Sequence, residues 1–284
     1  MKRSTVTEAG SDTDGYPTAL YRADRVADYV ESIDDITESD IDRFDERGYL
    51  AVRRLLGPAE VSEVLDGLAA VLTDPRDAAV EYESWAVDRV GQATGVERMD
   101  LVHKLMWFAS SHDQLARLAG DERIVQVVRR LTREQDLTMF QDMALLKPPG
   151  GGREKPWHQD NAYFNYEPGT PIVGVWIALD PATADNGCMH VLPGTHREGP
   201  RIHYRRRDWQ LCDTDVDTGR DIVVPLPAGG ALFFHGLIHH GTPANHTHTR
   251  RRAVQFHYLP MGTPGVADER RLELFGSEGK NVSC

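Results

Sequence analysis

Residues 137–146, LTMFQDMALL, mark a change in the texture of the chain. From this point on, short runs rich in β-branched and aromatic residues alternate with Gly, Pro, Asn and Asp. The later runs are IVGVWIALD (172–180), CMHVLP (188–193), IVVPLP (222–227), ALFF (231–234) and AVQFHYL (253–259). Several short strands divided by turn signals are typical of an antiparallel sandwich or barrel such as a jelly roll. We therefore expect a β core over about residues 136–262.

The residues before this core have helical patterns. Thr37 and Asp40 have the spacing of a capping box, which predicts a short helix that ends at Gly48. Pro58 suits the first turn of a second helix, whose apolar residues recur every three to four positions. These apolar residues are Val61, Val64, Leu65, Leu68, Val71 and Leu72. A third helical stretch is expected over roughly residues 112–133.

We expect one domain, residues 37–284, with an extension before it. Its helical part, about residues 37–135, should flank the β core, and a strand at 49–52 should separate the first two helices. Residues 1–36 are polar, acidic and aperiodic, which predicts a flexible, loosely ordered arm. Residues 263–284 should form a C-terminal tail. The expected fold class is mostly β with flanking helices.

Charge and composition disfavour several classes of protein. The formal net charge of −12 argues against broad binding to nucleic acid or anionic membranes, because both need a cationic surface. No apolar run approaches the roughly 20 residues of a membrane span, and the N-terminus lacks the apolar segment of a signal peptide. The three cysteines have no CxxC spacing, which suits a reducing compartment. We expect a cytoplasmic protein that acts on a small molecule, and the oligomeric state stays open.

The stretch WHQDNAYF, residues 157–164, contains two residue types that bind metals. On a strand, residues i and i+2 point to the same face, so His158 and Asp160 can reach one ion. A site of two histidines and one carboxylate needs another histidine from a distant strand and leaves positions open for substrate and oxygen. Residues 233–258 offer six candidates, and spacing alone does not choose among them. They are His235, His239, His240, His246, His248 and His257.

Several motifs, taken in order, resemble the phytanoyl-CoA dioxygenase family. They are HQDNAYF (158–164), IVGVWIAL (172–179), DNGCMHVLPGTH (185–196) and FFHGLIHHGTPANHTHTRRRAVQFHY (233–258). ERGYLAVRRLLGPAEVSEV (46–64) is similar to that family's opening helix–strand–helix, so the resemblance covers about residues 38–262. It implies a non-haem iron(II), 2-oxoglutarate-dependent oxygenase on a double-stranded β-helix, a jelly-roll or cupin-like core.

The resemblance assigns the iron ligands and the main cosubstrate contact. It places Fe(II) on His158, Asp160 and His240, the last because it directly precedes Gly-Thr. It places 2-oxoglutarate on Arg251, although the adjacent arginines of residues 250–252 leave a one-residue alternative. A planar guanidinium suits this role because it can grip a carboxylate with two parallel hydrogen bonds.

Further roles are expected around these residues. The cosubstrate pocket would be completed by a threonine hydroxyl, a tryptophan ring and the lysine of the motif VHKLMWF (102–108). The residues just after the His-x-Asp pair would face the substrate. The cosubstrate residues are Thr242, Trp176 and Lys104, and the substrate residues are Asn161, Tyr163 and Phe164.

The implied reaction is the O2-dependent hydroxylation of an unactivated C–H bond, with release of succinate and CO2. Desaturation, epimerisation and ring closure are alternatives within the same class, whereas chlorination is disfavoured because Asp160 fills the position that a halide needs. A cupin-like isomerase or hydrolase without 2-oxoglutarate would leave Arg251 without a role. A non-catalytic binding member of the fold is the other alternative. The sequence does not identify the substrate or say whether it is a CoA thioester.

Overall fold

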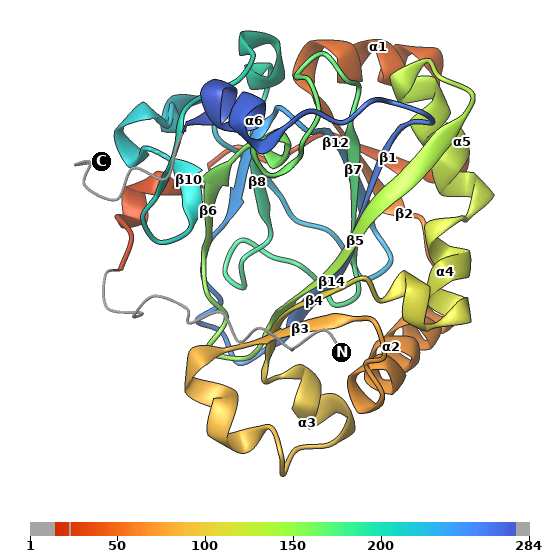
Figure 1. The fold of residues 1–284 in the computed structure, drawn as a ribbon, viewed down its shortest axis with the longest axis vertical. Helices are drawn as coiled ribbons and strands as arrows, with labels where there is room; N and C mark the ends of the chain where they lie inside the picture. Colours follow the sequence, from red (N-terminus) through yellow and green to blue (C-terminus); the bar gives the residue numbers. More distant parts are fainter. Residues whose placement is uncertain (1–14, 23, 277–284) are drawn as a thin grey trace.

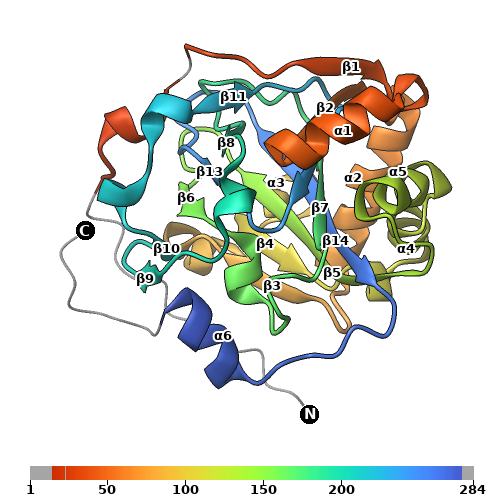
Figure 2. The ribbon, with the colours of Figure 1, turned by 90° about the horizontal axis from the view of Figure 1, so that it is seen from above.

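The computed structural model describes residues 15–22 and 24–276. An eight-stranded sheet runs through the molecule, and a separate four-stranded sheet faces one of its sides. Helices cover the opposite side of the large sheet, as Figure 2 shows from above. The two sheets are not joined into a closed barrel. This layered arrangement confirms the predicted fold class, mostly β with flanking helices.

Both sheets join strands that are distant in the sequence. In spatial order, the large sheet contains β1 (Tyr29–Ser32), β2 (Tyr49–Arg54), β12 (Ala231–His235), β7 (Val173–Ala178), β14 (Arg251–Pro260), β5 (Leu137–Lys147), β4 (Val102–Met106) and β3 (Ala79–Tyr82). The small sheet contains β11 (Ile222–Val224), β8 (Met189–Leu192), β13 (His239–Thr242) and β6 (Lys155–His158). A hairpin is formed by β9 (His203–Arg205) and β10 (Trp209–Leu211).

The α-helices lie mainly in the N-terminal half (Figure 1). They are α1 (Glu38–Arg47), α2 (Pro58–Thr73), α3 (Gly95–Met99), α4 (Asp113–Ala119), α5 (Glu122–Thr132) and α6 (Asp268–Phe275). Among the described residues, no helix combines the length and the apolar character that crossing a membrane requires.

Local sequence signals explain where the first two helices begin and end. The backbone N–H of Thr37 donates to the Asp40 carboxylate over 2.8 Å, which completes the capping box of α1. Gly48 ends α1 in the left-handed conformation, with φ of 82°. Pro58 occupies the first turn of α2, where its missing N–H costs no hydrogen bond. The predictions for both helices are confirmed.

Two parts of the predicted helical region differ from expectation. The helix expected over residues 112–133 is divided into α4 and α5, because Gly120 ends the first and Asp121 caps the second. Residues 79–106 contribute strands β3 and β4, which were not predicted and which extend the large sheet beyond β5. These strands are short and border the sheet, so their sequences carry little of the alternation that identifies a half-buried strand.

The two ends of the described chain pack against the core. Strand β1 pairs in parallel with β2, and Leu20 is buried with Trp157, whose indole N–H donates to the Leu20 carbonyl over 2.9 Å. This differs from the loosely ordered arm expected over residues 1–36, of which residues 1–14 and 23 lie outside the described residues. Helix α6 likewise folds back and buries Phe275, whereas residues 277–284 of the expected tail are not described.

The large sheet has two chemically different faces. On β14, Val254 and Phe256 point toward the helices and join their apolar core. Gln255 and His257 alternate with them and therefore point toward the small sheet. The space between the two sheets thus receives buried polar side chains from a strand whose other face packs Val254 and Phe256 into the apolar core.

Candidate active site

Three of the predicted residues meet between the sheets. His158 ends β6, and the antiparallel register places His240 of β13 directly opposite it. Asp160 begins a short 3-10 helix (Asp160–Tyr163) just after β6, so it lies beside the strand and not on it as expected. One potential ligand atom from each residue lies within 4.8 Å of the others, and all three residues are buried. Of the six candidate histidines, His240 joins the His158–Asp160 pair to form this His-Asp-His cluster.

Backbone carbonyls orient both imidazoles of the cluster. His158 Nδ1 lies 2.7 Å from the Pro156 carbonyl, and His240 Nδ1 lies 3.0 Å from the Ile238 carbonyl. Each Nδ1–H donates to the carbonyl two residues earlier, which leaves Nε2 unprotonated and directed at the centre of the cluster. Burial lowers the pKa of His158 to about 4, so its ring is neutral at physiological pH. A neutral imidazole nitrogen is the form that binds metals.

The two oxygens of Asp160 have different surroundings. Oδ1 faces the cluster, 3.2 Å from His158 Nε2 and 3.5 Å from His240 Nε2. Oδ2 accepts hydrogen bonds from His257 Nε2 at 2.7 Å and from Gln255 Nε2 at 3.2 Å. These two donors occupy Oδ2 and leave Oδ1 as the oxygen available to an ion.

Sequence reasoning missed the orienting roles of Gln255 and His257. The signal was present, because Arg251, Gln255 and His257 share one face of β14 at two-residue spacing. The sequence did not show that the Gln255 and His257 side chains contact Asp160, because Asp160 is 95 and 97 positions away from them along the chain.

Arg251 lies on the same face and forms no ion pair with the acidic residues that the structure describes. Its side chain is buried, and its nearest hydrogen-bond acceptor is the Leu145 carbonyl, 3.5 Å from Nη1. None of the described acidic residues forms an ion pair with it, and burial lowers its pKa to about 10. Its neighbours differ, since Arg250 pairs with Asp100 and Arg252 pairs with Asp180. Arg251 is therefore the arginine of this trio that is placed to bind a buried anion.

A cavity of about 310 Å³, which we call the inner cavity, opens onto the cluster. Lys104, Thr242, Tyr163 and Phe164 line it. Lys104 projects from β4 with Nζ 3.9 Å from the Glu81 carboxylate, and burial lowers its pKa. The cavity wall also includes Leu145, whose carbonyl lies 3.5 Å from Arg251 Nη1, so the guanidinium lies next to this wall without lining the cavity itself.

Besides Arg251, two predicted pocket residues do not line the inner cavity. The ring of Trp176 faces the guanidinium of Arg251, with 5.5 Å between the ring centre and the guanidinium carbon. Asn161 is buried against Gly236, whose carbonyl accepts its backbone N–H over 3.0 Å, and it lines no described cavity. The turn of the 3-10 helix explains the difference, because it rotates Asn161 away from the side that carries Asp160.

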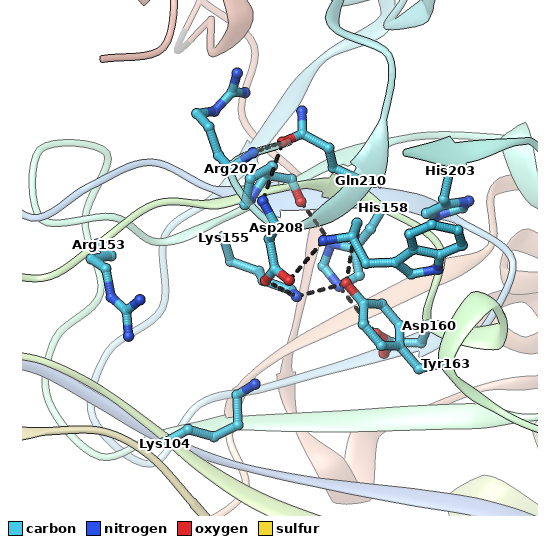
Figure 3. A network of polar contacts seen from close by, with 12 residues as sticks. Lys104, Arg153, Lys155, His158, Asp160, Tyr163, His203, Arg207, Asp208 and Gln210 are labelled. Atoms are coloured by element: carbon cyan, nitrogen blue, oxygen red, sulfur yellow. Dashed lines mark hydrogen bonds and ion pairs between the residues drawn. The ribbon is translucent and has the colours of Figure 1, made fainter. Parts of the chain in front are cut away.

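A charged network that the sequence did not reveal fixes one wall of the site. Figure 3 shows Lys155 between Tyr163 and Asp208, with Nζ 2.8 Å from the tyrosine oxygen and 2.5 Å from the carboxylate. Burial alone would lower the pKa of Lys155, but Asp208 raises it above its usual value. The ring of Tyr163 is thereby held edge-on to His158, at 5.7 Å between ring centres. No local pattern predicts this network, because Asp208 comes from the distant β9–β10 hairpin.

The fold and the cluster together define a class of protein. Two histidines and one carboxylate around a cavity in a jelly-roll core are the arrangement of non-haem iron(II) oxygenases. The chain is similar in structure to EvdO2 from Micromonospora carbonacea var. aurantiaca complexed with 2-oxoglutarate, with a TM-score of 0.64, 23% identity, and coverage of 85% of this chain and 98% of that one. It is also similar to the epimerase SnoN in complex with Fe3+, alpha ketoglutarate and nogalamycin RO, with a TM-score of 0.65, 21% identity, and coverage of 87% and 91%. At these identities the two structures show the shared fold.

Sequence comparison gives the family. The model of the phytanoyl-CoA dioxygenase (PhyH) family matches residues 44–253. The peroxisomal phytanoyl-CoA dioxygenase of Rattus norvegicus is 26% identical over 261 residues, which cover 84% of this chain and 71% of the relative. The chain belongs to the phytanoyl-CoA dioxygenase family. This membership confirms the predicted resemblance and the predicted class, an iron- and 2-oxoglutarate-dependent oxidoreductase.

Proposed function

We propose that this protein hydroxylates an unactivated C–H bond of a small molecule, with release of succinate and CO2. His158 Nε2, Asp160 Oδ1 and His240 Nε2 are the proposed ligands of Fe(II). The donor set fits this ion, because two neutral imidazoles and one carboxylate oxygen leave coordination positions for a cosubstrate and O2. The tautomers that the backbone carbonyls favour and the occupied Oδ2 support the assignment, since all three donor atoms face one point.

The observation that carries the proposal is that Arg251 is buried and has no ion-pair partner within the described part of the chain. A buried cation without a counter-ion is costly, and the distal carboxylate of 2-oxoglutarate would supply the missing anion. Thr242 offers a hydroxyl and Lys104 an ammonium on the wall of the inner cavity. A cupin-like isomerase or hydrolase would have no use for Arg251, and a non-catalytic binding protein would have no use for the intact His-Asp-His cluster.

The protein's own groups would bind and orient the reactants. Iron with 2-oxoglutarate and O2 supplies the oxidising power, and the chain positions the substrate and excludes water. Tyr163 and Phe164, which line the inner cavity together with the cluster, would hold the reacting carbon. The Lys155–Asp208 pair keeps Tyr163 fixed, so this wall should need little rearrangement when the substrate binds.

A substrate-library screen tests the proposal. Purified protein with Fe(II), 2-oxoglutarate and O2 is incubated with small-molecule pools, and succinate is measured beside product masses. We expect a product heavier than its substrate by one oxygen atom, formed only when 2-oxoglutarate is present. Turnover that persists without 2-oxoglutarate would contradict the proposal. A product lighter by two hydrogen atoms would replace hydroxylation with desaturation or ring closure, and a product of unchanged mass would point to epimerisation.

A further inference from the structure

A second cavity of different chemistry, which we call the outer chamber, borders the inner cavity. It has a volume of about 300 Å³ and shares Gln141, Tyr163 and Phe164 with the inner cavity. Five of its eight lining residues are aromatic, and none of the eight is charged. They are Trp107, Phe140, Gln141, Tyr163, Phe164, Asn165, Tyr166 and Gly265. These walls suit a flat, uncharged group, because aromatic faces and edges attract other rings and offer no counter-ion.

Trp107 at the chamber wall has an unusual conformation. Its side chain is 50% exposed, and its backbone is left-handed with φ of 58°, a region that bulky residues rarely adopt. The buried Asp142 carboxylate holds the following turn, accepting the N–H of Phe108 at 3.1 Å and that of Ala109 at 2.8 Å. Core packing does not account for a half-exposed indole on a strained backbone. Its position beside the chamber does, if the indole contacts a ligand.

Gln141 supplies a second, independent observation. It lines both cavities, and its side-chain oxygen is buried without a hydrogen-bond partner in the described part of the chain. Buried polar atoms are nearly always paired, so an O–H or N–H of a ligand is the expected partner. Gln141 therefore favours a ligand that carries a hydrogen-bond donor.

We propose that the outer chamber binds a flat, uncharged ring system of the substrate, with a hydrogen-bond donor on that ring reaching Gln141. A cavity of roughly 150 Å³ is enough to hold benzene, so about two fused rings suit this volume. The reacting carbon would lie beyond Gln141 in the inner cavity. Only the placement of the reacting carbon rests on the proposed oxygenase function, because ring binding in the outer chamber is independent of chemistry at the cluster.

The test measures binding of 2-naphthol, a flat two-ring compound with one O–H donor, by calorimetry under anaerobic conditions. The full chain is used, with Fe(II) and 2-oxoglutarate present. Decahydro-2-naphthol is the matched probe, since it has the hydroxyl and the same ten ring carbons but puckered, non-aromatic rings. We expect 2-naphthol to bind the wild type at least about 10-fold more tightly than decahydro-2-naphthol. Equal affinity for the two probes would overturn the proposal.

Variants locate the binding. Trp107→Asn keeps a residue that tolerates the left-handed backbone, and it should weaken 2-naphthol binding about 3- to 10-fold, the loss expected for one aromatic contact. Phe140→Leu keeps apolar volume without a flat ring and should weaken it about 2- to 5-fold. Trp85→Asn is the control, because Trp85 is 44% exposed but does not line the chamber, and its affinity should match the wild type. An unchanged affinity in both chamber variants would overturn the proposal.

Two further outcomes separate this inference from its alternatives. If the wild type self-associates and Trp107→Asn abolishes that association without changing 2-naphthol binding, the indole is a contact between copies and the proposal fails. Repeating the titration without Fe(II) and 2-oxoglutarate isolates the chamber from the cluster. Binding of 2-naphthol that depends on Trp107 under those conditions supports the inference, even for a protein that fails to turn over 2-oxoglutarate.

Discussion

The two faces of strand β14 have different roles: one packs into the apolar core, and the other contributes side chains to the candidate active site. Toward the helices, Val254 and Phe256 are fully buried among apolar side chains. Toward the small sheet, Arg251, Gln255 and His257 are equally buried but polar, and both Arg251 Nε and His257 Nδ1 lack a hydrogen-bond partner among the described residues. One strand therefore stabilises the fold on one face and keeps under-satisfied polar groups on the other. Conflicts of this kind are expected at functional sites.

The largest effect should follow from removing a residue of the His-Asp-His cluster. His240→Ala should abolish turnover and the binding of one Fe(II) per chain, because two donor atoms hold the ion far less well than three. His239→Ala is the neighbouring control, since His239 is buried but lies outside the cluster. Anaerobic iron titration with succinate measurement checks both variants. Full iron binding in His240→Ala, with loss in His239→Ala, would show that the third ligand is wrongly assigned.

The helix-facing side of β14 should affect stability alone. Phe256→Ala removes a fully buried ring that packs edge-on against Phe108, at 5.9 Å between ring centres. The free energy of unfolding should fall by about 3–5 kcal/mol, the usual cost of such a cavity. Denaturant titration measures this loss, and the metal affinity of the folded variant should match the wild type. A weakened metal site in folded Phe256→Ala would mean that the two faces are coupled.

Arg251→Ala should show the opposite pattern. Losing the charged partner of a buried carboxylate costs about 2–5 kcal/mol, so the apparent KM for 2-oxoglutarate should rise roughly 30- to several-thousand-fold. Stability in the absence of cosubstrate should hold or improve, because the variant no longer buries an unpaired cation.

Two variants control the Arg251 prediction. Arg251→Lys should restore only part of the affinity, since an ammonium lacks the two-pronged geometry of a guanidinium. Arg250→Ala should leave the KM unchanged, because Arg250 is paired with Asp100 at the surface. A strong KM effect at Arg250 with none at Arg251 would contradict the assignment.

The two faces of β14 also illustrate which features of the fold and the site could be predicted from the sequence. The expectation that His158 and Asp160 reach one point agrees with the structure, although Asp160 begins a 3-10 helix and strand alternation does not place it there. The choice of Arg251 came from the family resemblance, and its role stays a prediction. The strands β3 and β4 were missed because their sequences are short and carry no clear period. Asn161 was expected to line the substrate pocket but lines neither described cavity, because the 3-10 turn directs its side chain elsewhere. The contacts of His257 and Lys155 depend on residues distant in the chain, which no local pattern encodes.

The smallest of the predicted effects concerns His257, whose hydrogen bond holds Asp160 Oδ2 at 2.7 Å. Removing a group that orients a metal ligand typically lowers metal affinity about 10- to 100-fold. We therefore expect His257→Phe, which keeps a ring but loses the N–H donor, to weaken Co(II) binding within that range in anaerobic titrations. His257→Gln retains a donor and should recover most of the affinity.

The pair of His257 variants separates orientation from packing. If His257 acts only by filling space, His257→Phe should bind Co(II) as tightly as the wild type and His257→Gln should be the weaker of the two. If it acts by occupying Oδ2, His257→Gln should bind Co(II) more tightly than His257→Phe. The melting temperatures of the metal-free variants need not follow this order. Gln255 provides the internal check, because its longer bond of 3.2 Å to the same oxygen is the weaker restraint. Gln255→Leu should therefore reduce Co(II) affinity less than His257→Phe, and the reverse order would assign the orienting role to the glutamine.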